Sequence, residues 1–228
     1  MAKKKKETQD TSAEALQNAL TKTEQYIENN QKSLTIIVLA IVVIVGLFLG
    51  YKKLYIAPKE AEAQVQIFAA EQYFEKDSFN LALFGDGNYL GFIDIVSNYG
   101  PTKTGNLANY YAGICYRALG DYDLAIEHLK KFNPKDRMIG SVAYGSIGDC
   151  YVQLGRLDDA AKYYVKAANY GKNTFTTPLY LMKAGTVYEE LGQFSEALKV
   201  YNRIKTDYSK STEARDAEKH IARVNLSL

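Results

Sequence analysis

One phrase occurs three times in the chain and constrains its fold more than any other feature. Residues 117–129 read RALGDYDLAIEHL, residues 153–164 read QLGRLDDAAKYY, and residues 190–201 read ELGQFSEALKVY. Each phrase has a Leu-Gly pair, an Ala five residues after the Gly, and a large residue four further on. Because the phrase recurs at a nearly fixed period, the sequence predicts an array of repeated structural units.

The repeated residues indicate what each unit looks like. If the Gly is position 15 of a 34-residue unit, the units begin at Asn106, Ser141 and Pro178. A Gly at position 15 can end a helix in the left-handed conformation without the strain that a Cβ atom would cause. Small residues at positions 8 and 20 let two helices approach, and large residues at positions 11 and 24 fill the seam. The recurring residues are Gly113, Gly148 and Gly185 at position 8; Tyr116, Tyr151 and Tyr188 at 11; Ala125, Ala160 and Ala197 at 20; and Leu129, Tyr164 and Tyr201 at 24.

This unit resembles the tetratricopeptide repeat (TPR), a helix-turn-helix of 34 residues that stacks with its neighbours. The resemblance covers about half of the chain and implies an all-α solenoid of about four helix hairpins. A degenerate first hairpin precedes the three clear units, with Asp77 in place of the Gly. Its loop is expected at LFGDGNYLG (83–91), where the GDG triplet forms a turn, and its second helix at GFIDIVSNYG (91–100). The stripe of Ala214, Ala217, Ile221 and Val224 predicts a C-terminal capping helix.

An apolar run without charged residues, Ser33 to Tyr51, precedes the repeats. At ~1.5 Å per residue it is about 28 Å long, close to the thickness of a bilayer core. A buried core helix and a cleaved signal peptide are the alternatives; the long preceding segment and the following FLGYKKLY argue against cleavage. We expect an uncleaved single-pass anchor. Lysines near the run are balanced, so the Lys3–Lys6 cluster decides for a cytoplasmic N-terminus.

The segment before the apolar run has a helical stripe at Leu16, Leu20, Thr23 and Ile27, with Ser12 as a candidate N-cap. It predicts either a short surface helix against the membrane lipid or a docking helix for a cytoplasmic partner. The expected organisation is then as follows: tail 1–32, transmembrane helix 33–51, linker and degenerate repeat 52–105, repeats 106–140, 141–177 and 178–210, and capping helix with tail 211–228.

No catalytic, metal or cofactor motif is found in the sequence. The two histidines, His128 and His220, are interpreted as helix-surface residues, and no nucleophile, P-loop or metal-ligand spacing surrounds them. We therefore expect no enzyme activity and no cofactor. The net charge of +2 shows no excess of basic residues of the kind that indicates nucleic-acid binding. Cys115 and Cys150 share position 10 of successive units, ~10 Å apart by helix-packing distance, so no disulfide is expected.

Helix A positions 2, 5, 9, 12 and 13 should line the concave groove of such an array. This groove suits a partner helix or an extended segment of another protein; an ordinary wetted groove is the alternative. Glu189 is expected to be exposed there. The candidate partner-binding residues are Tyr110, Ile114, Arg117, Asp149, Val152, Met182, Thr186 and Glu189.

The order of tail, single span and TPR domain resembles the YfgM-type ancillary subunit of the bacterial Sec translocon. That resemblance implies an inner-membrane protein with its TPR domain in the periplasm. Its implied partners are SecYEG and a membrane-anchored prolyl isomerase-like chaperone. The phrase KTDYSKSTEA (205–214) also resembles periplasmic TPR scaffolds of the Tol-Pal or outer-membrane assembly type. A third alternative is an organelle import receptor with a cytosolic TPR domain.

Overall fold

The computed structural model describes residue 21 and residues 24–226, which form two compact units divided between Ile56 and Ala57. The predicted N-terminal stripe is mostly outside this range, since Leu16, Leu20 and Thr23 lie outside the described residues, as does its candidate cap Ser12. Of the stripe, only Ile27 is described, and it is helical.

The first unit contains α2 (Gln31–Tyr51) and the π-helical segment η1 (Lys52–Ile56). None of the α2 side chains is buried within the chain, and the helix is long and apolar enough to cross a membrane. A membrane anchor and a signal sequence both meet that description. The start of the predicted linker is helical, since residues 52–56 form η1 and α3 follows at Ala57.

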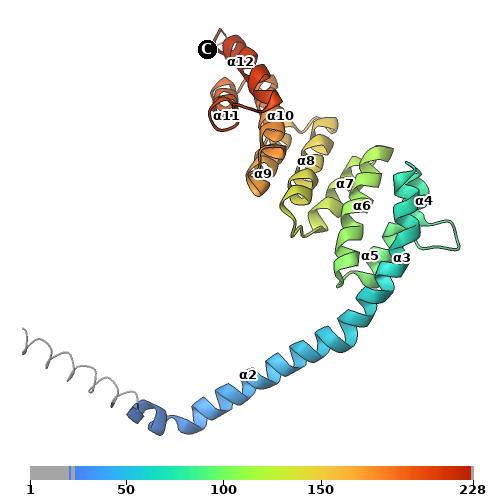
Figure 1. Cartoon of the computed structure of the whole chain (residues 1–228), viewed down its shortest axis with the longest axis vertical. Helices are drawn as coiled ribbons and strands as arrows, with labels where there is room; N and C mark the ends of the chain where they lie inside the picture. Colours follow the sequence, from blue (N-terminus) through green and yellow to red (C-terminus); the bar gives the residue numbers. More distant parts are fainter. Residues whose placement is uncertain (1–20, 22–23, 227–228) are drawn as a thin grey trace, which may run out of the picture. The chain divides into compact units, whose positions relative to one another are not determined.

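The second unit is all-α, and its helices pack in chain order, each against the next (Figure 1). Three hairpins correspond to the three predicted repeats: α6 with α7, α8 with α9, and α10 with α11. The helices run as follows: α3 Ala57–Glu75, α4 Phe79–Phe84, α5 Phe92–Tyr99, α6 Lys103–Leu119, α7 Tyr122–Lys131, α8 Arg137–Gln153, α9 Leu157–Gly171, α10 Thr176–Glu190, α11 Phe194–Asp207 and α12 Thr212–Asn225.

The repeated residues have the positions that the sequence predicts. Gly120, Gly155 and Gly192 are all left-handed, with φ of 89°, 68° and 69°. At position 8, a Cβ built on each Gly would meet the position-24 side chain of its own hairpin. The distances are 2.5 Å to Leu129, 2.7 Å to Tyr164 and 2.3 Å to Tyr201 for Gly113, Gly148 and Gly185. In each hairpin, the glycine on helix A therefore leaves the space that a large side chain of helix B fills.

The degenerate first hairpin has its predicted second helix, which is α5, and also a short helix that the sequence did not predict. Asp77 does replace the Gly and adopts φ 54°. The additional helix is α4, which follows Asp77, and the loop between α4 and α5 begins at Gly85, two residues later than expected. Asp86 makes that loop a turn, because its carboxylate accepts from the backbone N–H groups of Asn88 and Tyr89 at 2.9 and 2.8 Å.

The predicted capping helix is confirmed as α12. Ser211 caps it by accepting from the Ala214 N–H at 3.3 Å, and Ala214, Ala217 and Val224 are buried. Cys115 and Cys150 are free, buried thiols, as predicted. Burial raises the pKa of Cys115 to about 12 and that of Cys150 to about 11.

Candidate protein-binding groove

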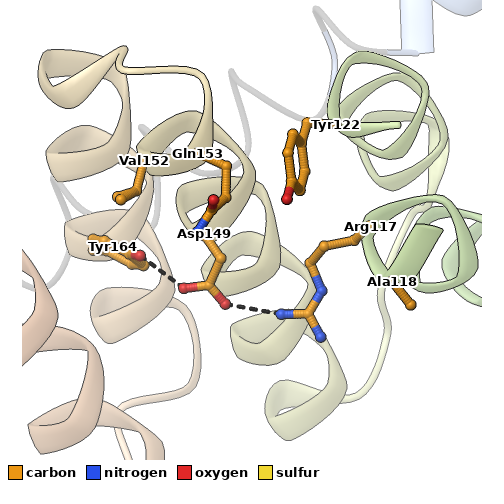
Figure 2. A pocket seen from close by; sticks show the side chains of 7 residues that line it. All are labelled: Arg117, Ala118, Tyr122, Asp149, Val152, Gln153 and Tyr164. Atoms are coloured by element: carbon orange, nitrogen blue, oxygen red, sulfur yellow. Dashed lines mark hydrogen bonds and ion pairs between the residues drawn. The ribbon is translucent and has the colours of Figure 1, made fainter. Parts of the chain in front are cut away.

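A pocket of about 350 Å³ opens between the helix A segments of the first and second clear repeats (Figure 2). Arg117 and Ala118 come from α6, while Asp149, Val152 and Gln153 come from α8. Tyr122 at the start of α7 and Tyr164 of α9 complete the lining. All five helix A residues are at positions that the sequence pattern assigned to the groove.

One carboxylate connects three consecutive repeats at this pocket. Asp149 Oδ2 accepts from Arg117 Nη1 at 3.0 Å, and Asp149 Oδ1 accepts from Lys183 Nζ at 2.6 Å. Tyr164 donates its hydroxyl to Oδ1 at 2.7 Å. We call these four residues the Asp149 cluster. Arg117, Asp149 and Lys183 lie at positions 12, 9 and 6 of successive units. They form a row across the three repeats that shifts by about one helical turn from each repeat to the next.

The Asp149 cluster carries two cations for one carboxylate, so the groove is locally positive. The side chains of Arg117 and Lys183 are 37% and 39% exposed, which leaves both charges accessible to a bound partner. Nε of Arg117 is buried and lacks a hydrogen-bond partner in the described part of the chain. Burial, followed by the negative charge of Asp149, raises the pKa of Tyr164, so its hydroxyl is a proton donor at neutral pH.

Tyrosine rings support the Lys183 side of the cluster. Tyr164 and Tyr180 stack with ring centroids 6.4 Å apart, and Lys183 Nζ lies 5.5 and 6.0 Å from their centroids. Tyr180 also covers Gly145, where a Cβ would come within 2.0 Å of the ring. The prediction that Gly145 lines an open groove is therefore wrong, because the next repeat fills that position.

Other predicted groove residues lie apart from this pocket. Tyr110 is half-buried against Phe132 and Tyr111, with ring centroids 5.3 and 5.7 Å apart, so much of its ring belongs to the core. Ile114 is also partly buried and packs on the core. Met182 and Thr186 are one turn apart on α10, where the Thr186 hydroxyl donates to the Met182 carbonyl at 3.2 Å.

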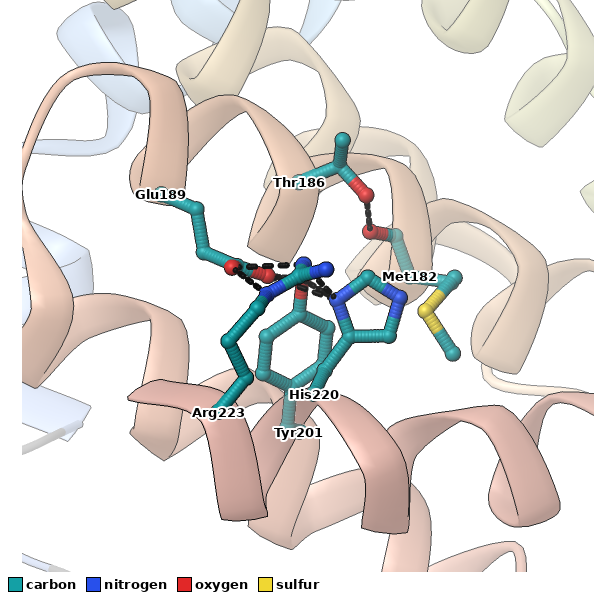
Figure 3. A network of polar contacts seen from close by, with 6 residues as sticks. All are labelled: Met182, Thr186, Glu189, Tyr201, His220 and Arg223. Atoms are coloured by element: carbon teal, nitrogen blue, oxygen red, sulfur yellow. Dashed lines mark hydrogen bonds and ion pairs between the residues drawn. The ribbon is translucent and has the colours of Figure 1, made fainter. Parts of the chain in front are cut away.

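Glu189 is not the exposed groove residue that the sequence predicted; its side chain is only 13% exposed. Its Oε1 contacts the Tyr201 hydroxyl and His220 Nδ1, each at 2.6 Å, and its Oε2 accepts from Arg223 Nε and Nη2 at 2.9 and 2.7 Å. We call these four residues the Glu189 cluster (Figure 3). It joins α10, α11 and α12, and therefore attaches the capping helix to the last hairpin.

Neither histidine is the plain surface residue that the sequence suggested. His220 belongs to the Glu189 cluster and has a side chain that is 23% exposed. His128 is half-buried, stacks on Tyr116 with centroids 5.4 Å apart, and contacts Asn109 Oδ1 through Nδ1 at 3.1 Å. Burial, followed by the charge of Lys131, lowers the pKa of His128. His128 therefore packs within the first clear repeat, and His220 helps to attach the capping helix to the last hairpin.

We expect the Glu189 cluster to weaken in acid. Burial alone raises the pKa of Glu189, but hydrogen bonds from Tyr201, His220 and Arg223 outweigh it and leave the pKa below its usual value. The Glu189 carboxylate therefore binds a proton more tightly in the unfolded chain than in the folded chain. Its contribution to the free energy of unfolding is complete above about pH 5 and is lost as pH falls toward the folded-state pKa. Chemical denaturation at pH 7 and at lower pH should show a smaller acid loss for Glu189→Gln than for the unchanged protein; equal losses would contradict this expectation.

Sequence reasoning missed Tyr122, Tyr164 and Lys183 at the groove, and Tyr201, His220 and Arg223 at the cap. Tyr164 and Tyr201 had been assigned only to the seam at position 24. Each of these tyrosines in fact donates its hydroxyl to a helix A carboxylate of its own hairpin. The sequence did contain a signal for these contacts. The two repeats that have Tyr instead of Leu at position 24 also have a carboxylate residue on helix A.

Comparisons with known proteins agree with the repeat geometry. Models of the tetratricopeptide repeat match residues 107–133, 141–170 and 180–211. A TPR repeat-containing protein of Methanocaldococcus jannaschii is 30% identical over 95 residues, which is 42% of this chain but only 16% of that protein. Two crystal structures of kinesin light chain TPR-like repeats from Podosopora anserina have a TM-score of 0.53 at 14% identity. The matched region is 72% of this chain and 85% and 86% of the two kinesin light chain structures. At this identity the likeness is one of fold alone.

Proposed function

We propose, from the premise that this chain is a tetratricopeptide repeat protein, that its array binds other proteins while α2 holds it at a membrane. Protein–protein interaction is the general role of such repeats, and it needs no catalytic group. The proposal is accordingly for a non-enzymatic module without a cofactor.

The Asp149 cluster is the observation that carries the binding proposal. It places two partly exposed cations and a carboxylate in one row across three repeats, beside a pocket with polar and apolar lining. A row that crosses successive helices fits an extended segment or a helix of a partner better than it fits a small molecule. Because the row is fixed by Tyr164 and by the neighbouring helices, a partner meets preorganised charges and loses less entropy on binding.

At a finer level, we propose that the module is an ancillary subunit of the bacterial Sec translocon. A tail that begins with a lysine cluster, one apolar helix and a TPR array follow one another in the order that resembles the YfgM type. In this proposal the N-terminus is cytoplasmic, and the groove faces emerging chains or a membrane-anchored prolyl isomerase-like chaperone in the periplasm. Anchoring raises the local concentration of the groove near membrane partners, so a weak contact is sufficient.

A periplasmic envelope scaffold is the second candidate, and one phrase supports it. KTDYSKSTEA (205–214) resembles a phrase of scaffolds of the Tol-Pal or outer-membrane assembly type. It forms the end of α11, the following turn and the Ser211-capped start of α12. This local role explains the phrase in structural terms alone, so we rank the scaffold second.

Two measurements on the full-length protein test these proposals. Protease added to spheroplasts should digest residues 57–226 if the array is periplasmic, whereas protection would place it in the cytosol. Pull-down in mild detergent, quantified by mass spectrometry, should recover Sec subunits and an isomerase-like protein. Recovery of Tol-Pal or outer-membrane assembly components instead would favour the scaffold.

A further inference from the structure

Helix α3 is apolar on two opposite faces. Ala63, Ile67 and Ala70 are buried against the rest of the array. The face opposite them carries Pro58, Ala61, Val65 and Phe68, spaced by three, four and three residues as neighbours on one helix face are. We call these four residues the α3 stripe. Val65 is 74% exposed and Phe68 is 63% exposed, so the stripe is uncovered in the part of the chain that the structure describes.

The rotation of α3 about its own axis is fixed, which keeps the α3 stripe outward. Glu60 accepts from the N–H groups of Lys103 and Thr104 at 2.7 and 3.2 Å, at the first turn of α6. Lys59 donates to the Asn98 carbonyl at 3.2 Å. Both contacts are made from the side of α3 that faces the array, so the stripe on the opposite side remains toward the outside.

The two ends of the repeat array differ in chemistry. At the C-terminal end, α12 has exposed Arg215, Asp216 and Lys219, with Lys219 and Asp216 paired at 2.9 Å. Terminal helices of repeat arrays need such a polar outer face for solubility. At the N-terminal end, the α3 stripe is apolar where a preceding repeat would pack. An apolar face on a terminal helix indicates that something covers it.

We propose that the α3 stripe is a homodimer contact, in which α3 of one copy packs beside α3 of a second copy in the same direction. The spacing of the stripe residues by three, four and three is that of the seam of a two-stranded coiled coil, which supports parallel pairing with an identical helix. In such a two-fold pairing each stripe residue meets its own counterpart. The absence of charge on the stripe suits this pairing, since no like charges meet. Ala61 lets the two backbones approach to the usual interhelical distance.

The size of the stripe determines when the dimer forms. Four side chains on one helix bury much less than the roughly 800 Å² per partner of a stable soluble complex. The contact is therefore weak between freely diffusing chains. Anchoring in one membrane supplies a high effective concentration, which converts a weak contact into a populated one.

Cysteine scanning of α3 in the full-length protein in native membranes tests the proposal. Single substitutions Ala61→Cys, Val65→Cys and Phe68→Cys are oxidised with a mild oxidant. Glu62→Cys, exposed on the flank of the same helix, and Asp216→Cys, exposed on α12, are the matched controls. The native Cys115 and Cys150 are fully buried, so they do not compete. Alkaline extraction of the same membranes reports separately whether the chain is anchored.

Disulfide-linked homodimers at positions 61, 65 and 68, well above those at 62 and 216, are the expected result. Val65→Glu should then abolish co-capture of differently tagged copies, while Glu62→Lys should leave it intact. Adducts with a different protein alone, no adducts, or equal yields at all five positions would overturn the homodimer. Extraction of the chain from membranes while the stripe adducts persist would overturn the membrane anchoring and leave the dimer standing.

Discussion

Gly148→Leu should lower the free energy of unfolding of the repeat array by about 3 kcal/mol, at the upper end of overpacking costs. A Cβ at this position would lie 2.7 Å from the Tyr164 ring, and Tyr164 is itself buried and bonded to Asp149. The ring has no free direction in which to move, so the larger side chain must separate α8 from α9. For a unit of this size, we expect a decrease in Tm of roughly 6–12 °C.

Gln153→Leu is the matched control for that substitution. It introduces the same side chain on the same helix at an exposed position, where changes are usually within about 0.5 kcal/mol. Thermal unfolding of both variants, followed by circular dichroism, makes the comparison. Equal melting temperatures would mean that α8 and α9 are not in the close contact that a position-8 glycine requires.

Glu189→Leu should also destabilise the array, by about 2 kcal/mol, because it removes charge-assisted hydrogen bonds from a mostly buried site. The change leaves the Tyr201 hydroxyl, His220 and the Arg223 guanidinium without their shared acceptor. Since these groups attach α12 to α10 and α11, amide hydrogen exchange should accelerate most in α12. The sequence had placed Glu189 exposed on the open groove, where a substitution usually changes stability by no more than about 0.5 kcal/mol.

Glu190→Leu serves as the control for Glu189→Leu. Glu190 is the next residue along α10, and it is exposed. We expect its replacement to change the unfolding free energy by at most about 0.5 kcal/mol. If both variants unfold alike, or if exchange in α12 does not change, the Glu189 cluster does not hold the cap in place.

The architecture was predictable because the repeated residues report on contacts within one hairpin. A glycine at position 15 identifies a helix end through its backbone conformation, and Gly120 adopts φ 89°. A glycine at position 8 identifies a close helix contact, as Gly185 against Tyr201 illustrates. Both signals depend on residues near one another in the sequence, so a single chain is sufficient to recognise them.

The candidate site was less predictable because it depends on contacts between hairpins. Asp149 bonds to residues 32 and 34 positions away, Arg117 and Lys183, and no local pattern specifies those pairs. The same applies to Tyr180 over Gly145, where a large side chain from the next repeat fills a position expected to be open. The position of a residue within a repeat indicates which helix face it occupies. It does not indicate which side chain of the adjacent repeat covers that face.

The first hairpin deviates for a different reason. An additional short helix, α4, precedes the predicted loop, and Gly85 with φ 77° turns the chain after the six residues of α4. The GDG triplet correctly indicated a turn. The sequence did not reveal that a short helix precedes the triplet, because FNLALF is as compatible with a loop-flanking apolar stretch as with a helix.

Site-specific photocrosslinking in native membranes tests most directly whether the groove beside Asp149 binds protein. A photoreactive residue at Gln153 lies on the pocket lining, whereas one at Lys162 lies exposed on α9 outside that lining. We expect adducts to other proteins from position 153 that weaken when Arg117 and Lys183 are both changed to Ala, and little from position 162. Adducts mainly from position 162, or none from position 153 in membranes that contain the full-length protein, would contradict the assignment of the groove as the binding surface.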